Sequence, residues 1–73
     1  MSARTSSESA VMRRVVARHI HCALAAERNL DRDALDPQTI NLVTGFARSA
    51  RGLLAELEAA GVDLTVELAE VAS

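Results

Sequence analysis

The 73-residue sequence has almost no aromatic side chains: Phe46 is the only one, and Trp and Tyr are absent. Aromatic residues bring the largest buried area per residue to a core, so this interior has to consist of aliphatic side chains and alanine. A chain of this size also buries only about 60% of the surface that its unfolded form exposes. We therefore expect a marginal core that gains stability by association with another chain.

Several other residue types and segments are missing. Cys22 is the only cysteine, which excludes an internal disulfide, and all eight basic residues are arginine, as is typical of a high-GC bacterial or phage genome. No apolar run approaches the roughly 20 residues of a membrane span, and the first ten residues contain no signal-peptide core. These absences predict a cytoplasmic protein that does not contact a membrane.

No motif of a catalytic or cofactor site is present. The sequence contains no P-loop, GxGxxG, GxSxG or CxxC pattern. The acidic segment 31–36 begins like an EF-hand loop, but Leu35, Asp36 and Leu42 occupy positions that require an acid, a glycine and a glutamate. We therefore predict a protein that is not an enzyme, with no cofactor, no metal and no small-molecule substrate.

The first half of the chain has a helical pattern. Residues 1–7 are small and polar and predict a flexible arm, followed by a helix over about 8–30. At about 100° per residue, the apolar side chains of this helix cover one broad half of its circumference. They are Val11, Met12, Val15, Val16, Ile20, Cys22, Ala23, Ala26 and Leu30. A turn over 31–36 ends this pattern.

A second helix is predicted from Pro37 to about Ala60. Asp36 can cap its first turn, Pro37 is tolerated at the first helical position, and Gly61 can close it in the left-handed conformation. Apolar residues in steps of three and four form a seam: Ile40, Val43, Ala47, Ala50, Leu54 and Leu57. Phe46 and Leu53 widen the seam.

Small residues form a strip beside this seam, at Gly45, Ser49 and Gly52. A glycine inside a helix costs about 1 kcal/mol relative to alanine, so the strip needs a reason. We favour the close approach of another helix over a bend near Gly52. The tail 62–73 fits either a strand or a short helix that follows Asp63, and we favour the helix because the chain offers no second strand to pair with.

These elements predict an all-α single domain over residues 8–73, an antiparallel hairpin with a short C-terminal helix. Folding about the 31–36 turn places Ile20 near Phe46, Val16 near Ala50 and Met12 near Leu54. Two such helices leave apolar surface uncovered, and a homodimer that completes a four-helix bundle would cover it. The expected interface consists of Ile40, Val43, Phe46, Ala50, Leu53, Leu54, Leu57, Met12, Val16 and Ile20.

Charge is divided between the two halves of the chain. Residues 1–32 carry six arginines and three acidic residues, whereas residues 33–73 carry two arginines and seven acidic residues. An antiparallel hairpin brings the basic start of the first helix toward Glu56 and Glu58. Each exposed ion pair would contribute only about 0–1 kcal/mol, so this pairing favours the orientation without dominating stability.

The stretch RHIHCA places His19, His21 and Cys22 within four positions. On the helix His19 falls near the centre of the apolar half and His21 on the polar half, so the two histidines cannot bind one ion. His19 and Cys22 share a side, which leaves open a four-ligand site across a symmetric dimer or a thiol activated by histidine. We favour a histidine in the core or an interface, whose protonation below about pH 6.5 would loosen the assembly.

Arginines form a stripe without acids along the polar side of the first helix and the following turn, at Arg14, Arg18, Arg28 and Arg32. Such a stripe can contact several phosphates, although no aromatic is available to stack on bases. The segment 35–64, LDPQTINLVTGFARSARGLLAELEAAGVDL, resembles the helical-hairpin part of some phage small terminase subunits and covers less than half of the chain. The resemblance implies an oligomeric DNA-packaging subunit.

The sequence therefore leaves two functions to weigh. We favour a non-enzymatic interaction protein, a small subunit or accessory of a larger assembly that forms a homo-oligomer or binds a protein partner. The alternative is an oligomeric DNA- or RNA-binding protein that uses the arginine stripe. An acidic protein partner for the stripe is a third possibility.

Overall fold

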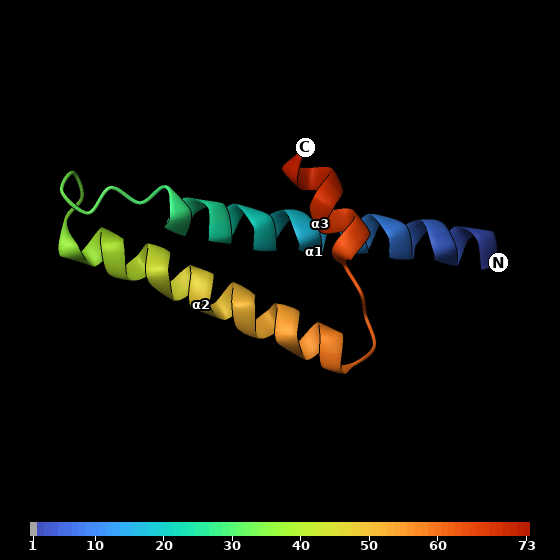
Figure 1. Ribbon diagram of the computed structural model, residues 1–73. Coiled ribbons are helices and arrows are strands. Elements are labelled where there is room, and N and C mark those ends of the chain that lie inside the picture. Colours follow the sequence, from blue (N-terminus) through green and yellow to red (C-terminus); the bar gives the residue numbers. More distant parts are fainter. Residues whose placement is uncertain (1) are drawn as a thin grey trace.

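The protein folds into three helices and contains no strand over residues 2–73, the part of the chain that the computed structural model describes; side chains are described from residue 8 onward. Helix α1 spans Ser2–Arg28, α2 spans Pro37–Ala59 and α3 spans Thr65–Ala72. Figure 1 shows α1 and α2 side by side in opposite directions, with α3 lying across α1. The predicted all-α hairpin with a short C-terminal helix is confirmed.

Helix α1 differs from the prediction at both ends. Its backbone is helical from Ser2, six residues before the start that we expected at about residue 8. A helix gains one hydrogen bond for each further residue it fixes, and small polar residues can therefore extend one that is already formed. At the other end α1 stops at Arg28, and both nitrogens of Asn29 donate to the Ala25 carbonyl.

Helix α2 begins and ends at the predicted signals. The Asp36 carboxylate accepts hydrogen bonds from the Thr39 hydroxyl at 2.6 Å and the Thr39 backbone N–H at 3.3 Å, and these bonds lower the pKa of Asp36. Gly61 has a φ of 87°, and the amides of Gly61 and Val62 donate to the carbonyls of Glu58 and Leu57. This is a Schellman ending, which satisfies carbonyls that the last turn leaves free.

The tail forms the short helix that we favoured over a strand. The Asp63 carboxylate accepts hydrogen bonds from the Thr65 hydroxyl at 2.6 Å and the Thr65 amide at 2.9 Å, which turns the chain into α3. These bonds lower the pKa of Asp63. Leu64, the residue just before α3, is the buried side chain of this segment, since it is only 2% exposed.

A small core lies where α1 meets both other helices. Among residues 8–73, its buried side chains are Ala17, Ile20, Ala47, Ala50 and Leu64. Ile20, Ala50 and Leu64 form one cluster, and residues from all three helices and the α2–α3 connection pack against it. The backbone of α3 lies close to α1 and not to α2. Helix α1 is therefore the central element.

One predicted neighbour across the hairpin is wrong. Ile20 was expected beside Phe46, but it packs in the cluster of Ala50, while Phe46 is 68% exposed. In Figure 1 the 29–36 connection continues past the end of α1 before α2 begins, so α2 starts further out along the hairpin than a tight turn would place it. Sequence spacing alone does not reveal this extension.

The two glycines of the small-residue strip on α2 meet no other part of the chain that the structure describes. A Cβ atom added at Gly45 or Gly52 would have no neighbouring atom within 4 Å. The close approach that we favoured is therefore wrong for the elements of this chain, since both glycines face open space. Helix α2 continues through both positions without interruption.

The molecule is elongated. Its radius of gyration is 14.7 Å and its extents are 51 × 24 × 17 Å, whereas a compact domain of 73 residues has a radius of gyration of about 11 Å. Within residues 2–73, no helix has the length and apolar content needed to cross a lipid bilayer. Elongation leaves a large surface for a chain in which five apolar side chains of residues 8–73 are buried.

Candidate interaction surface

The seam of α2 faces α1 of the same chain. Ala47 and Ala50 are buried, and Leu54 and Leu57 pack against the core cluster together with Val16 of α1. Ile40 and Val43 are half-buried. Of the ten residues expected at an oligomer interface, most of those on the seam therefore already have partners within the hairpin.

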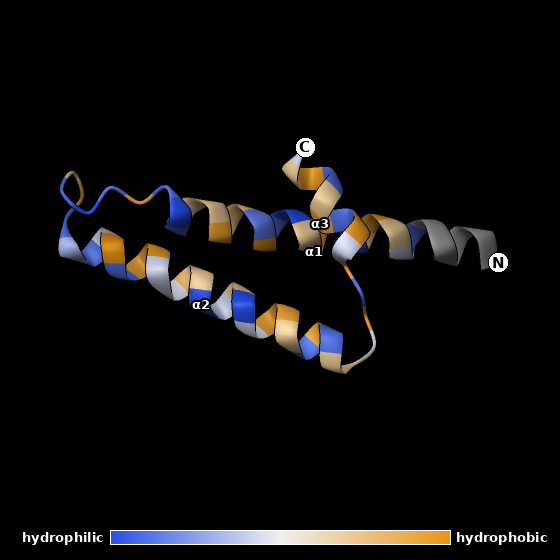
Figure 2. Ribbon diagram, in the orientation of Figure 1, coloured by the Kyte–Doolittle hydropathy of each residue, from blue (hydrophilic) through white to orange (hydrophobic). Residues whose placement is uncertain are grey.

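The three remaining residues of that set are free to meet another molecule. Met12, Phe46 and Leu53 are 59%, 68% and 43% exposed. Val11, Val15 and Leu42 are also large, apolar and exposed. Figure 2 shows that apolar residues recur along α2 and along the coloured part of α1. We call the surface formed by these six residues the open face: Val11, Met12, Val15, Leu42, Phe46 and Leu53.

The residues of the open face lie on the same side of the hairpin. At about 100° per residue, Phe46 and Leu53 lie about a quarter turn from the seam of α2. On α1, Met12 lies about 60° and Val15 about 120°, in the same rotational sense, from the side that Val16 and Ile20 turn toward the core. Because α1 and α2 are antiparallel, equal offsets in the same sense point to the same side.

The opposite side of the hairpin is covered by α3. Arg13 of α1 donates from Nε to the Glu67 Oε2 of α3 at 2.9 Å, and its Nη2 donates to the Asp63 carbonyl. The hydrogen bond lowers the pKa of Glu67 and raises that of Arg13. Glu67 Oε1 is buried and has no hydrogen-bond partner within the described residues. Arg13 thus holds α3 at both its first turn and the loop before it.

A second ion pair links the two long helices near the connection. Arg51 donates to Glu27 at 2.7 Å, which lowers the pKa of Glu27 and raises that of Arg51. The sequence analysis expected the basic start of α1 to face Glu56 and Glu58. The ion pairs of Arg13 and Arg51 involve Glu67 and Glu27 instead, so the charge division indicated the antiparallel orientation but not the residues that pair.

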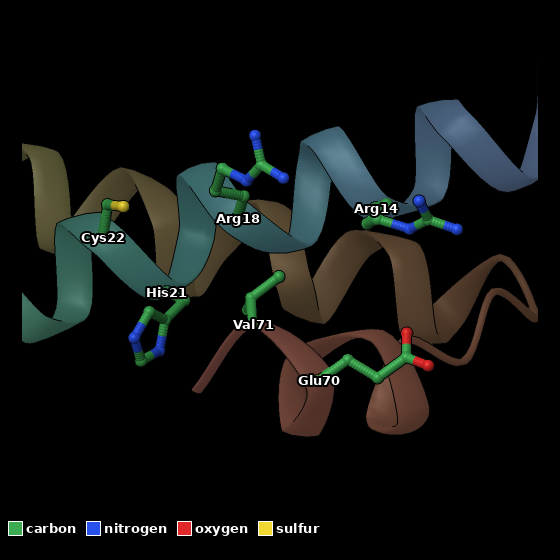
Figure 3. A pocket seen from close by; sticks show the side chains of 6 residues that line it. All are labelled: Arg14, Arg18, His21, Cys22, Glu70 and Val71. Atoms are coloured by element: carbon green, nitrogen blue, oxygen red, sulfur yellow. The ribbon is translucent and has the colours of Figure 1, made fainter. Parts of the chain in front are cut away.

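The arginine stripe is divided by the fold. Arg14 and Arg18 line an open pocket of about 520 Å³ between α1 and α3, together with His21, Cys22, Glu70 and Val71. Figure 3 shows both arginines and Cys22 on α1, with Glu70 and Val71 approaching from α3. Arg28 and Arg32 are exposed further along the chain and do not line this pocket.

Two features of this pocket bear on anion binding. Arg14 and Arg18 form no ion pair with any carboxylate whose side chain the structure describes, so their guanidinium groups are available. Glu70, however, brings an acidic side chain to the same pocket, which the helical pattern of α1 alone does not show. The pocket therefore combines two cations with one acid.

The residues of RHIHCA separate, although His19 is not in the core. His19 is exposed, and its Nδ1 lies 2.9 Å from the Val15 carbonyl of the preceding turn. His21 is half-buried and Cys22 is exposed. Among residues with described side chains, no group of three or more His, Cys, Asp and Glu is placed to hold a metal ion. His19 at the interface with a partner stays a prediction.

The helical pattern of α1 located its apolar half correctly but not the part of it that is buried. The buried side centres near Ile20 and Ala17, because α1 has to contact both α2 and α3. The side near Val11, Val15 and His19 is left exposed. A pattern of residues shows which side chains are apolar, whereas the position of α3 decides which of them are covered.

Comparison with known proteins gave no match to any family model, to any curated protein or to any solved structure. The resemblance to phage small terminase subunits therefore rests on segment 35–64 alone.

Proposed function

We propose that this chain is a non-enzymatic helical interaction protein whose open face binds another helical surface. The supporting observation is the position of Phe46, the largest apolar side chain of the sequence, which is 68% exposed although the chain has a small core. Leu42 and Leu53 lie on the same side of α2 and extend this surface along the helix. Exposed apolar surface that is continuous in this way marks interaction sites in soluble proteins.

Sedimentation of the full chain at micromolar concentration tests this function. The wild type should sediment as an assembly, and Phe46→Glu should sediment as a monomer, because a charge on the open face loses its hydration when it is covered. Val66→Glu is the matched control: Val66 is 66% exposed, but it lies on α3 and outside the open face. A wild type that stays monomeric and binds no other chain would contradict the proposal.

A second candidate function is the binding of DNA or RNA through Arg14 and Arg18. It is supported by the exposure of both side chains and by their lack of ion pairs with the carboxylates that the structure describes. Phosphate contacts by arginine supply most non-specific affinity for nucleic acids and weaken as salt rises. The acid at Glu70, and a pocket lining that contains no Phe, Trp or Tyr on which a base could stack, make this the weaker candidate.

Salt-dependent binding to a DNA or RNA duplex distinguishes the two candidates. If nucleic acid is the ligand, replacement of Arg14, Arg18 and Arg28 by glutamate should abolish binding. Arg48→Glu, which changes an exposed arginine of α2, should reduce it much less. No binding at low salt would leave the interaction protein as the function.

A further inference from the structure

The pocket between α1 and α3 is lined by charged side chains of both signs. Arg14 and Arg18 come from the α1 wall, and Glu70 comes from the α3 wall beside Val71 (Figure 3). The pocket has a volume of about 520 Å³, and binding sites for small molecules in proteins range from about 300 to 1,000 Å³. Its size and its lining therefore suit a small charged ligand.

The spacing of the arginines places both on one wall. Residues three and four apart are neighbours on the surface of a helix, so Arg14 and Arg18 lie one turn apart on the same side of α1. His21 and Cys22 continue this wall in the next turn. Because the two guanidinium groups come from adjacent turns, they can bind two acidic groups of one small ligand.

The position of α3 fixes the opposite wall. The ion pair between Arg13 and Glu67 holds the start of α3 on α1, and Leu68 packs against the core cluster. Glu70 lies three residues after Glu67, so it also lies on the side of α3 that faces α1, where it lines the pocket. The contacts that hold this wall in place do not use the charges of the pocket.

The three charges of the pocket are not paired with one another. Among residues with described side chains, no ion pair joins Arg14 or Arg18 to Glu70, and none of the three takes part in another ion pair. Arg13, by contrast, pairs with Glu67 in the same contact between α1 and α3. Two cations therefore face one acid across the pocket, and each remains able to bind a ligand.

This set of charges selects the ligand. A simple anion would pair with the arginines but would bring a like charge to Glu70, and a simple cation would meet the opposite difficulty. Two negative charges and one ammonium group on the same small molecule match the pocket completely. Guanidinium groups bind carboxylates through two parallel hydrogen bonds, so carboxylates are suitable carriers of the negative charges.

We propose that the pocket between α1 and α3 binds a small acidic amino acid, with its carboxylates on Arg14 and Arg18 and its ammonium group on Glu70. This inference goes beyond the proposed function, which concerns a protein partner on the other side of the hairpin. The pocket binds this ligand without converting it, in keeping with a non-enzymatic chain. A ligand held by both walls also joins α3 to α1.

Titration of the full chain with L-glutamate tests the proposal. Backbone amide shifts of α1 and α3, measured by NMR at constant ionic strength, report binding. Glutarate is the matched ligand, because it has the same two carboxylates and no ammonium group. L-glutamate should bind about tenfold or more tightly than glutarate, since a hydrogen bond between charged groups contributes at least this factor. Equal binding of the two ligands, or no binding of either, would overturn the proposal.

Substitutions assign the groups of the ligand to the two walls. Glu70→Gln should weaken L-glutamate and not glutarate, so the preference between the two ligands should disappear. Arg18→Gln should weaken both ligands about tenfold. Arg28→Gln and Glu56→Gln are the controls, because they change exposed charges outside the pocket, and neither should alter an affinity. A preference that survives in Glu70→Gln would show that the ammonium group does not bind there, against the proposal.

The outcomes separate this inference from the proposed function. Phe46→Glu changes the open face and should bind L-glutamate as the wild type does. A wild type that forms an assembly but binds no L-glutamate would overturn this inference alone. A nucleic-acid duplex that binds through Arg14 and Arg18, while L-glutamate does not bind, would assign these arginines to phosphates and overturn it as well.

Discussion

The two sides of the hairpin differ in what covers them more than in composition. One side carries α3, the Leu64 side chain and the ion pair between Arg13 and Glu67. The other carries exposed residues of the same aliphatic type, among them Met12 and Val15. The comparison shows that apolar pattern selects candidates for burial, while the position of a third helix decides which of them become core. Similar substitutions can therefore be made on each side and their effects compared directly.

The largest expected difference between the sides is in stability. Ile20→Ala on the covered side should lower the free energy of unfolding by about 2–5 kcal/mol, because it leaves a cavity in a small core. Met12→Ala on the open side should change monomer stability much less, since Met12 is 59% exposed and Ile20 is 1% exposed. Urea unfolding of both variants at low protein concentration measures this. Equal losses would show that the two sides are not distinct.

A smaller effect is expected where the chain turns toward the covered side. Gly61 has a φ of 87°, and an L side chain is strained in that conformation. Gly61→Ala should therefore destabilise the protein by about 1 kcal/mol. Thermal unfolding followed by circular dichroism would detect the lower midpoint, and an unchanged midpoint would mean that the turn after α2 accepts another conformation.

The same substitution at Gly52 should have the opposite sign. Gly52 is inside α2, and a Cβ there meets no atom within 4 Å, so alanine adds helix propensity without a clash. Gly52→Ala should raise the unfolding free energy by up to about 1 kcal/mol. Thermal unfolding at low protein concentration isolates this effect from association. Destabilisation there would indicate a contact with Gly52 that this fold does not contain.

The smallest expected effect is the response of α3 to acid. The hydrogen bond from Arg13 lowers the pKa of Glu67, so its contribution is complete above the ordinary glutamate value of 4.5 and is lost as the pH falls through the lowered pKa. Amide exchange in α3, corrected for its intrinsic pH dependence, should therefore accelerate below about pH 4.5 relative to α2.

Two variants check the origin of this acid response. Glu67→Gln should remove it and loosen α3 already at neutral pH. Glu70→Gln changes an exposed acid on the same helix and should leave α3 as it is in the wild type. A response that persists in Glu67→Gln would have to come from another group.

The local signals of the sequence predicted the helices well. Asp36 and Pro37 begin α2 and Gly61 closes it, because capping depends on a few neighbouring residues whose geometry is nearly fixed. The tail was also correctly predicted to be a helix, because the chain has no second strand with which a strand there could pair. These features need no knowledge of the rest of the fold.

Long-range features were predicted less well. Val15 and His19 belong to the apolar half of α1, but the fold buries the side that Ile20 and Ala17 occupy. The partner of Arg13 is Glu67, 54 residues away, and not Glu56 or Glu58. Such pairings depend on where α3 crosses α1 and on how far the 29–36 connection extends. A local sequence pattern predicts neither of these features.

The crossing of α3 over α1 has a consequence for the order of folding. Contacts between α1 and α2 can form as soon as the hairpin is synthesised, whereas the contact between Arg13 and Glu67 closes a loop of more than fifty residues. Closing a longer loop costs more entropy, and contacts between distant residues form later in folding. We therefore expect the hairpin to form first and Ile20 to remain partly accessible until Leu64 arrives. During that interval the side that α3 later covers would be as open as the other.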